Sequence, residues 1–441
     1  MKSLLAIGAL IFSTAFAFAA TDENSDAAKQ LQIYPMNLAR QSVGSNLFVF
    51  NATSQSYVPT EAAAAWLDDD VATGWPPAPG KSYYLLSLAQ AQLVNNFAIS
   101  AKAGASGTVT IYAGDDLAPP TAKSWTPIAK DLNIEAINNK TLAKPFSRFT
   151  KYLLIETNVP EANANTWYSI YVYGESPATS FQIQKRDKSI DTTPIFGQFV
   201  NNQTMFNLSS LYAGATVTYS NTSTDPVEMQ KAIAGSPESS VAIAPTKDES
   251  GMIIRYSEPR QIQRISVMAD PTAKGRLDFF LVGSLPAAAQ SSAKPNGSTT
   301  DAQFMKVAND TTAPSGNAAP GAVTLDNLTP NATLVLDGST GRGSIDFPAV
   351  TASYMIVRWT PETAGQNISV AEINSFGDLP LSDYTLVSNA PAVAEAAPDM
   401  SKEGDFKDKK QQPPIVSELL KDPFDPGPLG FPPNLTNRLS P

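Results

Sequence analysis

Short runs of Val, Ile, Tyr, Phe and Thr recur between Gly, Pro and Asn turns through most of this 441-residue chain. None of the runs carries a long helical period, and their close spacing favours an all-β sandwich over alternating βαβ units. The runs before residue 175 are Tyr83–Leu88, Phe97–Ala101, Thr108–Ala113, Tyr152–Thr157 and Ile170–Tyr173. A second set comprises Ala215–Ser220, Met252–Tyr256, Ile262–Met268, Leu277–Val282, Gly343–Phe347 and Tyr354–Trp359. We therefore expect an all-β protein with two comparable sets of strands.

The two sets of strands begin and end alike. Each opens with an Asn-Leu-small triplet, Asn37–Ala39 in the first and Asn207–Ser209 in the second. Each closes with a Tyr-containing strand followed by a strand that ends at a glycine, Gly174 or Gly377. This shared order of segments indicates a tandem duplication.

The strand pattern sets the predicted boundaries. One module spans residues 31–175 and a second spans 201–378, with 176–200 as an exposed linker. The second module is longer because residues 287–331 are rich in Ala, Ser, Thr, Pro, Asn and Gly, as expected for a surface insertion. Residues 390–441 lose strand periodicity and gain proline, which predicts a disordered tail.

The N-terminus has the organisation of a secretory signal. A charged start at Lys2 precedes the apolar run Leu4–Phe12 and the small-residue segment Ala15–Ala20. We expect residues 1–20 to be removed, although an uncleaved membrane anchor is the alternative. No later segment has about 18 consecutive apolar residues, so no membrane span is expected in the mature chain. Export predicts a periplasmic, cell-surface or extracellular protein.

Two residue types are missing from the chain, and their absence excludes whole classes of chemistry. The sequence has no Cys and no His. Disulfides, thiolate nucleophiles and catalytic pairs built on His are therefore unavailable. The net charge of −10 is spread along the chain with no Lys/Arg cluster beyond Lys407–Lys410, so nucleic acid is not expected as a partner.

The turn Asp68–Trp75, with Asp-x-Asp followed by Thr-Gly-Trp, resembles the pattern of the discoidin (coagulation-factor type C) family. The segment Trp125–Ile128 after a strand is also similar to that family. The resemblance covers residues 32–175 well and 200–378 more loosely. It implies two tandem eight-stranded jelly-roll β-sandwiches of the galactose-binding-like kind, whose loops bind sugars, lipid headgroups or protein partners, often near a structural Ca²⁺.

The sequence also departs from the family pattern. Asp69 stands where the family has Gly, and the late Glu of the family is present only as Glu372, with Ser169 as its counterpart in the first module. In the second module the positions of the family's Asp, Thr and Trp hold Ala234, Ser239 and Val241. The second copy is therefore expected to be degenerate.

A calcium site is possible in the first module. Asp68, Asp70 and Thr73 would supply part of the shell of six to eight oxygens that Ca²⁺ prefers. The alternative is an acidic turn whose side chains cap local backbone N–H groups. No other cofactor is required.

Carbohydrate recognition needs aromatic faces and a few planar hydrogen-bonding groups in a loop at one end of a sandwich. The resemblance implies structural roles for Trp75 and Trp125, because the family packs these positions in or against the core. Three other residues, Trp167, Tyr168 and the preceding Asn165, belong to a polar loop and the strand after it, and they are the best ligand-binding candidates. Tyr57 and Trp66 come from a second candidate loop.

The sequence predicts a non-catalytic binding protein that recognises carbohydrate or an envelope partner through loops of the first module. One alternative is a structural spacer of the envelope or extracellular matrix. Another is a carboxylate-based glycoside hydrolase or lyase, which needs two acids facing each other across a cleft. Clustering of Trp167, Tyr168 and Tyr57 at one end would favour binding, whereas burial of all three would favour the spacer.

Overall fold

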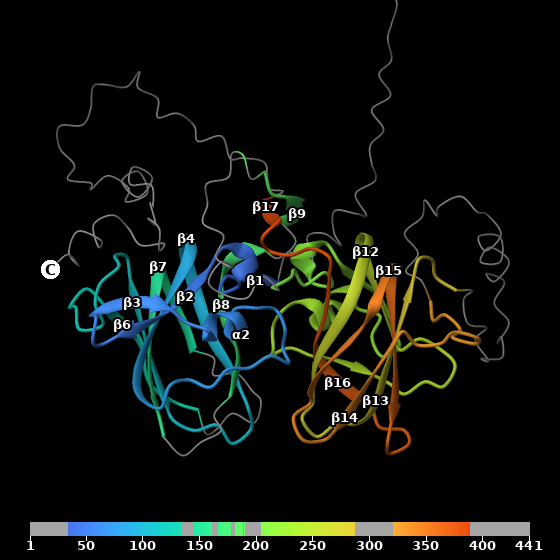
Figure 1. Cartoon of the computed structure of the whole chain (residues 1–441). Coiled ribbons are helices and arrows are strands. Elements are labelled where there is room, and N and C mark those ends of the chain that lie inside the picture. Colours follow the sequence, from blue (N-terminus) through green and yellow to red (C-terminus); the bar gives the residue numbers. More distant parts are fainter. Residues whose placement is uncertain are drawn as a thin grey trace, which may run out of the picture.

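The computed structural model describes residues 34–134, 144–160, 166–177, 181–187, 189, 204–286 and 321–388. These residues form two antiparallel β modules and one small two-stranded sheet, which confirms the predicted all-β class (Figure 1). No helix within these ranges is long and apolar enough to cross a membrane. The predicted signal segment, tail, most of the insertion and Asn165 lie outside the described residues.

The first module contains eight strands, as expected, with the order β1-β8-β4-β7-β5-β6 and with β2 and β3 joined to β4. Its strands are β1 (Pro35–Asn37), β2 (Asn46–Asn51), β3 (Ser56–Pro59), β4 (Gly80–Ala101), β5 (Thr108–Gly114), β6 (Thr126–Asn133), β7 (Lys144–Val159) and β8 (Trp167–Pro177). Its short helices are η1 (Gln41–Val43) and α2 (Ala62–Trp66). Strand β4 unites two predicted runs, because irregular pairing between Ser87 and Asn96 bends the strand without ending it.

The described residues of the second module form seven strands, in the order β11-β16-β12-β15-β13-β14 with β10 paired to β12. Its strands are β10 (Thr216–Ser220), β11 (Val241–Ile243), β12 (Met252–Ala269), β13 (Lys274–Val282), β14 (Ala332–Asp337), β15 (Arg342–Pro361) and β16 (Ile368–Gly377). Its short helices are η4 (Leu211–Ala213), α3 (Pro226–Met229) and η5 (Gln230–Ile233). Strands β12 and β15 again each unite two predicted runs.

The opening triplets have the same geometry in both modules. The Oδ1 atom of Asn37 accepts from the backbone N–H of Ala39 at 3.0 Å and of Val172 at 2.9 Å. The Oδ1 atom of Asn207 accepts from the equivalent groups of Ser209 and Ser375, both at 3.2 Å. Each Asn thus ties the start of its module to the final strand.

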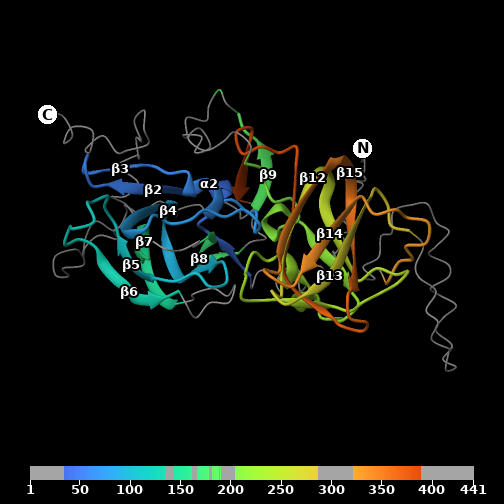
Figure 2. The same cartoon turned by 60° about the horizontal axis from the view of Figure 1, so that its bottom comes forward.

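Two further strands join the ends of the modules. Strand β9 (Phe181–Lys185) follows the first module and pairs antiparallel with β17 (Tyr384–Ser388), which follows the second. We name this pair the clasp. Figures 1 and 2 show it where the two modules meet. The predicted linker is therefore partly a strand, because apolar Phe181 and Ile183 alternate with glutamines and pack on the core.

Candidate functional site

The turn Asp68–Trp75 lies at the junction of the two modules. Asp69 and Arg40 form a buried ion pair, with 2.7 Å between Oδ1 and Nε. From the second module, the hydroxyl of Tyr212 donates to the Asp69 carboxylate, and Nδ2 of Asn374 donates to the Asp69 carbonyl at 2.6 Å. The residue that replaces the family's Gly therefore connects the modules.

Two more buried side chains of the second module, Arg342 and Glu372, contact the first module. Arg342 of β15 donates to the Val71 carbonyl at 2.6 Å and to the Ser100 hydroxyl, and its guanidinium lies 4.3 Å from the ring centre of Tyr168. The Tyr171 hydroxyl donates to Oε1 of Glu372 at 3.2 Å. Burial raises the pKa of the Glu372 carboxyl. These side chains of the second module thus make buried contacts with the first module, and the two modules pack against each other.

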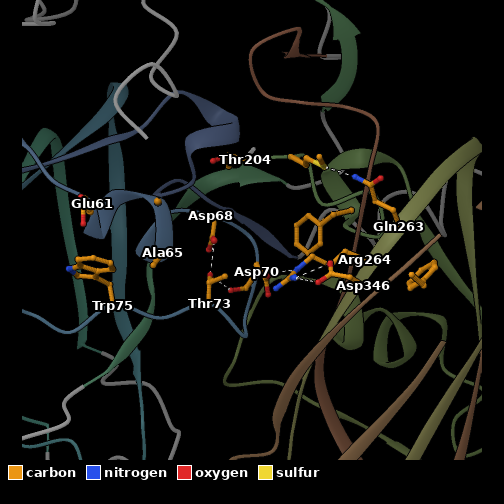
Figure 3. Close-up of a pocket in the computed structure, with 14 residues that line it drawn as sticks. Glu61, Ala65, Asp68, Asp70, Thr73, Trp75, Thr204, Gln263, Arg264 and Asp346 are labelled. Carbon is orange, nitrogen blue, oxygen red and sulfur yellow. Dashed lines mark hydrogen bonds and ion pairs between the residues drawn. The ribbon is translucent and has the colours of Figure 1, made fainter. Parts of the chain in front are cut away.

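A cleft of about 950 Å³ opens beside this junction (Figure 3). Both modules contribute side chains to its walls. Those from the first include Glu61, Asp68, Asp70, Thr73 and Trp75, and those from the second include Gln263, Arg264, Asp346, Phe347 and Phe376. The cleft thus combines aromatic and polar groups, and neither module forms it alone.

Trp75 lines one side of this cleft. The side chain is 40% exposed, whereas the other four tryptophans of the chain are at most 6% exposed. Its backbone is fixed by a two-way hydrogen-bonded bridge to Trp167, with N–O distances of 2.9 and 3.1 Å. The expected structural role is confirmed for Trp125, which is buried and donates to the Pro119 carbonyl, but expected core packing is wrong for Trp75.

Arg264 joins the two walls of the cleft. Its Nε atom donates to Oδ2 of Asp70 at 2.7 Å, and NH1 donates to Oδ1 and Oδ2 of Asp346 at 3.0 and 2.9 Å. NH2 donates to the Ser344 hydroxyl at 3.0 Å. Burial alone would lower the pKa of Arg264, but Asp70 and Asp346 raise it above its ordinary value, so the guanidinium stays charged.

The Asp68 carboxyl lies in surroundings that disfavour its charged form. Its Oδ2 atom accepts from the Thr73 hydroxyl at 2.6 Å, while Oδ1 is buried without a hydrogen-bond partner among the described residues. Burial and the neighbouring Asp70 carboxylate raise the pKa of Asp68 well above its ordinary value. The turn therefore holds two carboxyl groups in different surroundings: Asp70 is paired with Arg264, whereas Asp68 is buried beside Thr73.

The residues proposed for calcium do not fit the ion in this arrangement. The Oδ2 atom of Asp70 is paired with Arg264, and its Oδ1 atom accepts from the Ala72 N–H at 3.0 Å. Oδ2 of Asp68 is taken by Thr73. Across the described ranges, no three acidic side chains are grouped to hold a metal. These contacts match the alternative of an acidic turn that caps local backbone groups.

The predicted ligand-binding aromatics lie inside the first module. Trp66 and Trp167 are fully buried with ring centres 4.9 Å apart, and Tyr57 and Tyr168 are 5% and 9% exposed. The exposed face expected from these residues is therefore not present, because Trp167 begins β8 and packs into the core. Burial of Trp167, Tyr168 and Tyr57 favours a structural spacer over ligand binding by loops of the first module alone.

Sequence reasoning missed the second wall of the cleft. Gln263 and Arg264 belong to β12, and Asp346 belongs to β15. Each sits in a strand with an ordinary alternating pattern, so nothing in the local sequence marks it. The position of Arg264 becomes meaningful only when the modules meet.

No protein-family model matches the chain, and no curated protein matches it in sequence. Among solved structures, a chitosan-binding module of a chitosanase/glucanase from Paenibacillus sp. IK-5 is 21% identical, covers 32% of this chain and 99% of that chain, and has a TM-score of 0.24. A fucolectin from striped bass (Morone saxatilis) is 11% identical over 78% of this chain and 99% of its own, with a TM-score of 0.24. The allantoicase of Saccharomyces cerevisiae is 10% identical over 82% and 99%, with a TM-score of 0.23. At these scores, the class of two-module β-sandwich protein rests on the strand pairing described above.

Proposed function

We propose that this chain is a non-catalytic carbohydrate-binding protein whose ligand lies in the cleft between the modules. The observation that carries the proposal is the position of Trp75, the exposed tryptophan of the chain, in a cleft with polar side chains from both modules. An aromatic face with a few oriented polar groups is the composition of a saccharide site. The proposal moves the site from the loops of the first module to the junction.

Titration with oligosaccharides tests this proposal. Trp75→Ala removes the ring face and is expected to weaken saccharide binding at least about tenfold, which corresponds to about 1.4 kcal/mol. Phe149→Ala is the matched control, because Phe149 is a similarly exposed aromatic residue that does not line the cleft. Equal saccharide affinities of the two variants, measured by calorimetry on the full chain, would contradict the proposal.

A structural spacer is the second candidate. It is favoured by the buried contacts of Asp69, Arg342 and Glu372, which hold the modules in a fixed arrangement. A spacer would bind no saccharide, so the same titration distinguishes the two functions.

We propose no catalysis. Of the four acids that line the cleft, Asp70 and Asp346 both contact Arg264 and Asp68 accepts from Thr73, so Glu61 has no second unengaged acid facing it among the described lining residues. An assay for new reducing ends after long incubation with the bound polysaccharide tests this absence of hydrolysis. We also propose export through residues 1–20, which N-terminal sequencing of the mature protein would test.

A further inference from the structure

The charged side chains that line the cleft are strongly unbalanced. Among its described lining residues, four carry carboxyl groups and one, Arg264, carries a positive charge. The carboxyl groups are those of Glu61, Asp68, Asp70 and Asp346. A ligand that enters the cleft therefore meets acidic walls.

Arg264, the single cation among the described lining residues, is already hydrogen-bonded to protein groups. Each of the three guanidinium nitrogens of Arg264 donates to a protein oxygen, on Asp70, Asp346 or Ser344. A carboxylate or sulfate group on a sugar would need donors of this kind, usually in a bidentate pair. An acidic saccharide would thus have to break the contacts of Arg264 with both walls.

Two of the carboxylates are exposed in the cleft: that of Glu61, and that of Asp346, which is paired with Arg264. Glu61 is exposed, and its carboxylate makes no hydrogen bond or ion pair with the part of the chain that the structure describes. It lies on the same side of the cleft as the ring of Trp75 (Figure 3). The Asp346 side chain is 72% exposed on the opposite wall. A protonated amine near Trp75 would gain a carboxylate partner and the face of an aromatic ring.

We infer that the cleft selects saccharides with free amino groups over acidic saccharides, and that Glu61 is the residue that distinguishes the amino form from the N-acetylated form. This inference rests on the proposed function, because it assigns a class of ligand to the same cleft. The selectivity arises from charges fixed by the protein and not from the size of the cleft.

The test compares three oligosaccharides of equal length on the full chain at mildly acidic pH: β-1,4-linked glucosamine, its N-acetylated form and a uronic acid oligomer. The glucosamine oligomer is expected to bind about fivefold more tightly than the acetylated form at low salt, with the difference shrinking as salt screens the charges. The uronic acid oligomer is expected to bind at least about tenfold more weakly than the acetylated form.

Two variants locate the effect. Glu61→Gln is expected to weaken glucosamine binding about fivefold and to affect binding of the acetylated oligomer much less. Glu362→Gln is the control, because Glu362 is an exposed acid outside the cleft lining, and it should change neither affinity.

The outcomes separate this inference from the function on which it rests. Saccharide binding that depends on Trp75 but shows no preference for amino groups, or no effect of Glu61→Gln, would overturn the inference and retain the function. Preferred binding of the uronic acid oligomer would also overturn the inference. Absence of binding by all three oligosaccharides would overturn both.

Discussion

At the scale of single residues, the carboxyl group of Asp68 connects the environment of the cleft to protein stability. Burial and the Asp70 carboxylate raise the pKa of Asp68 above its value in the unfolded chain. A carboxyl group with a raised folded pKa contributes stability that is present below the unfolded pKa and is lost as pH rises through the folded pKa. At neutral pH the charged form is therefore a cost to folding.

Asp68→Asn removes this charge while keeping an oxygen that accepts from Thr73. We expect the variant to melt at a higher temperature than the wild type at neutral pH, with the difference shrinking as pH falls toward about 4. Thermal denaturation across this pH range measures the effect. Asp326→Asn, at an exposed acid, should show no such trend. A lower melting temperature of Asp68→Asn at neutral pH would refute the argument.

The tryptophans show how far residue-scale prediction from the sequence extends. Trp125 was correctly expected in the core, since it follows a strand and its indole finds the Pro119 carbonyl. Trp75 and Trp167 were assigned the wrong environments. They form a backbone bridge with each other, and yet Trp167 is fully buried while Trp75 is 40% exposed. The bridge joins residues 92 positions apart (167 − 75 = 92), and local patterns do not contain such a contact.

At the scale of elements, the clasp is expected to stabilise the junction. Leu386 of β17 packs against the core, whereas its neighbour Val387 points outward and is 37% exposed. Leu386→Ala should lower the free energy of unfolding by about 1 to 2 kcal/mol, because it deletes partly buried apolar surface. Val387→Ala should change it by less than about 0.5 kcal/mol. Urea denaturation of the two variants compares these values, and equal effects would mean that the clasp does not pack as described.

The sequence predicted strand positions well and strand limits poorly. Runs of Val, Ile, Tyr, Phe and Thr between turn residues located the segments that became β4, β12 and β15, but each of these long strands has irregular pairing and was read as two. Strand β17 was missed, and β9 was taken for linker. Each is five residues long, and each finds its only partner about 200 residues away.

At the scale of the whole molecule, the candidate site exists only because the two modules meet. Asp70 from the first and Asp346 from the second are held by one guanidinium, that of Arg264. The discoidin-like resemblance directed attention to the loops of the first module, because the sequence pattern of one module does not show how the two modules meet. Its acidic turn Asp68–Trp75 does reach the site, although as part of a wall and of the junction rather than as a calcium shell.

The most direct test of the central claim uses the intrinsic fluorescence of the protein. Of its five tryptophans, Trp75 alone is substantially exposed, so a water-borne quencher such as acrylamide should report mainly on the cleft. We predict that a saturating saccharide removes most of this quenching, and that Trp75→Phe lacks the accessible component from the start. Saccharide binding that leaves the quenching of the wild type unchanged would place the ligand elsewhere and contradict the account.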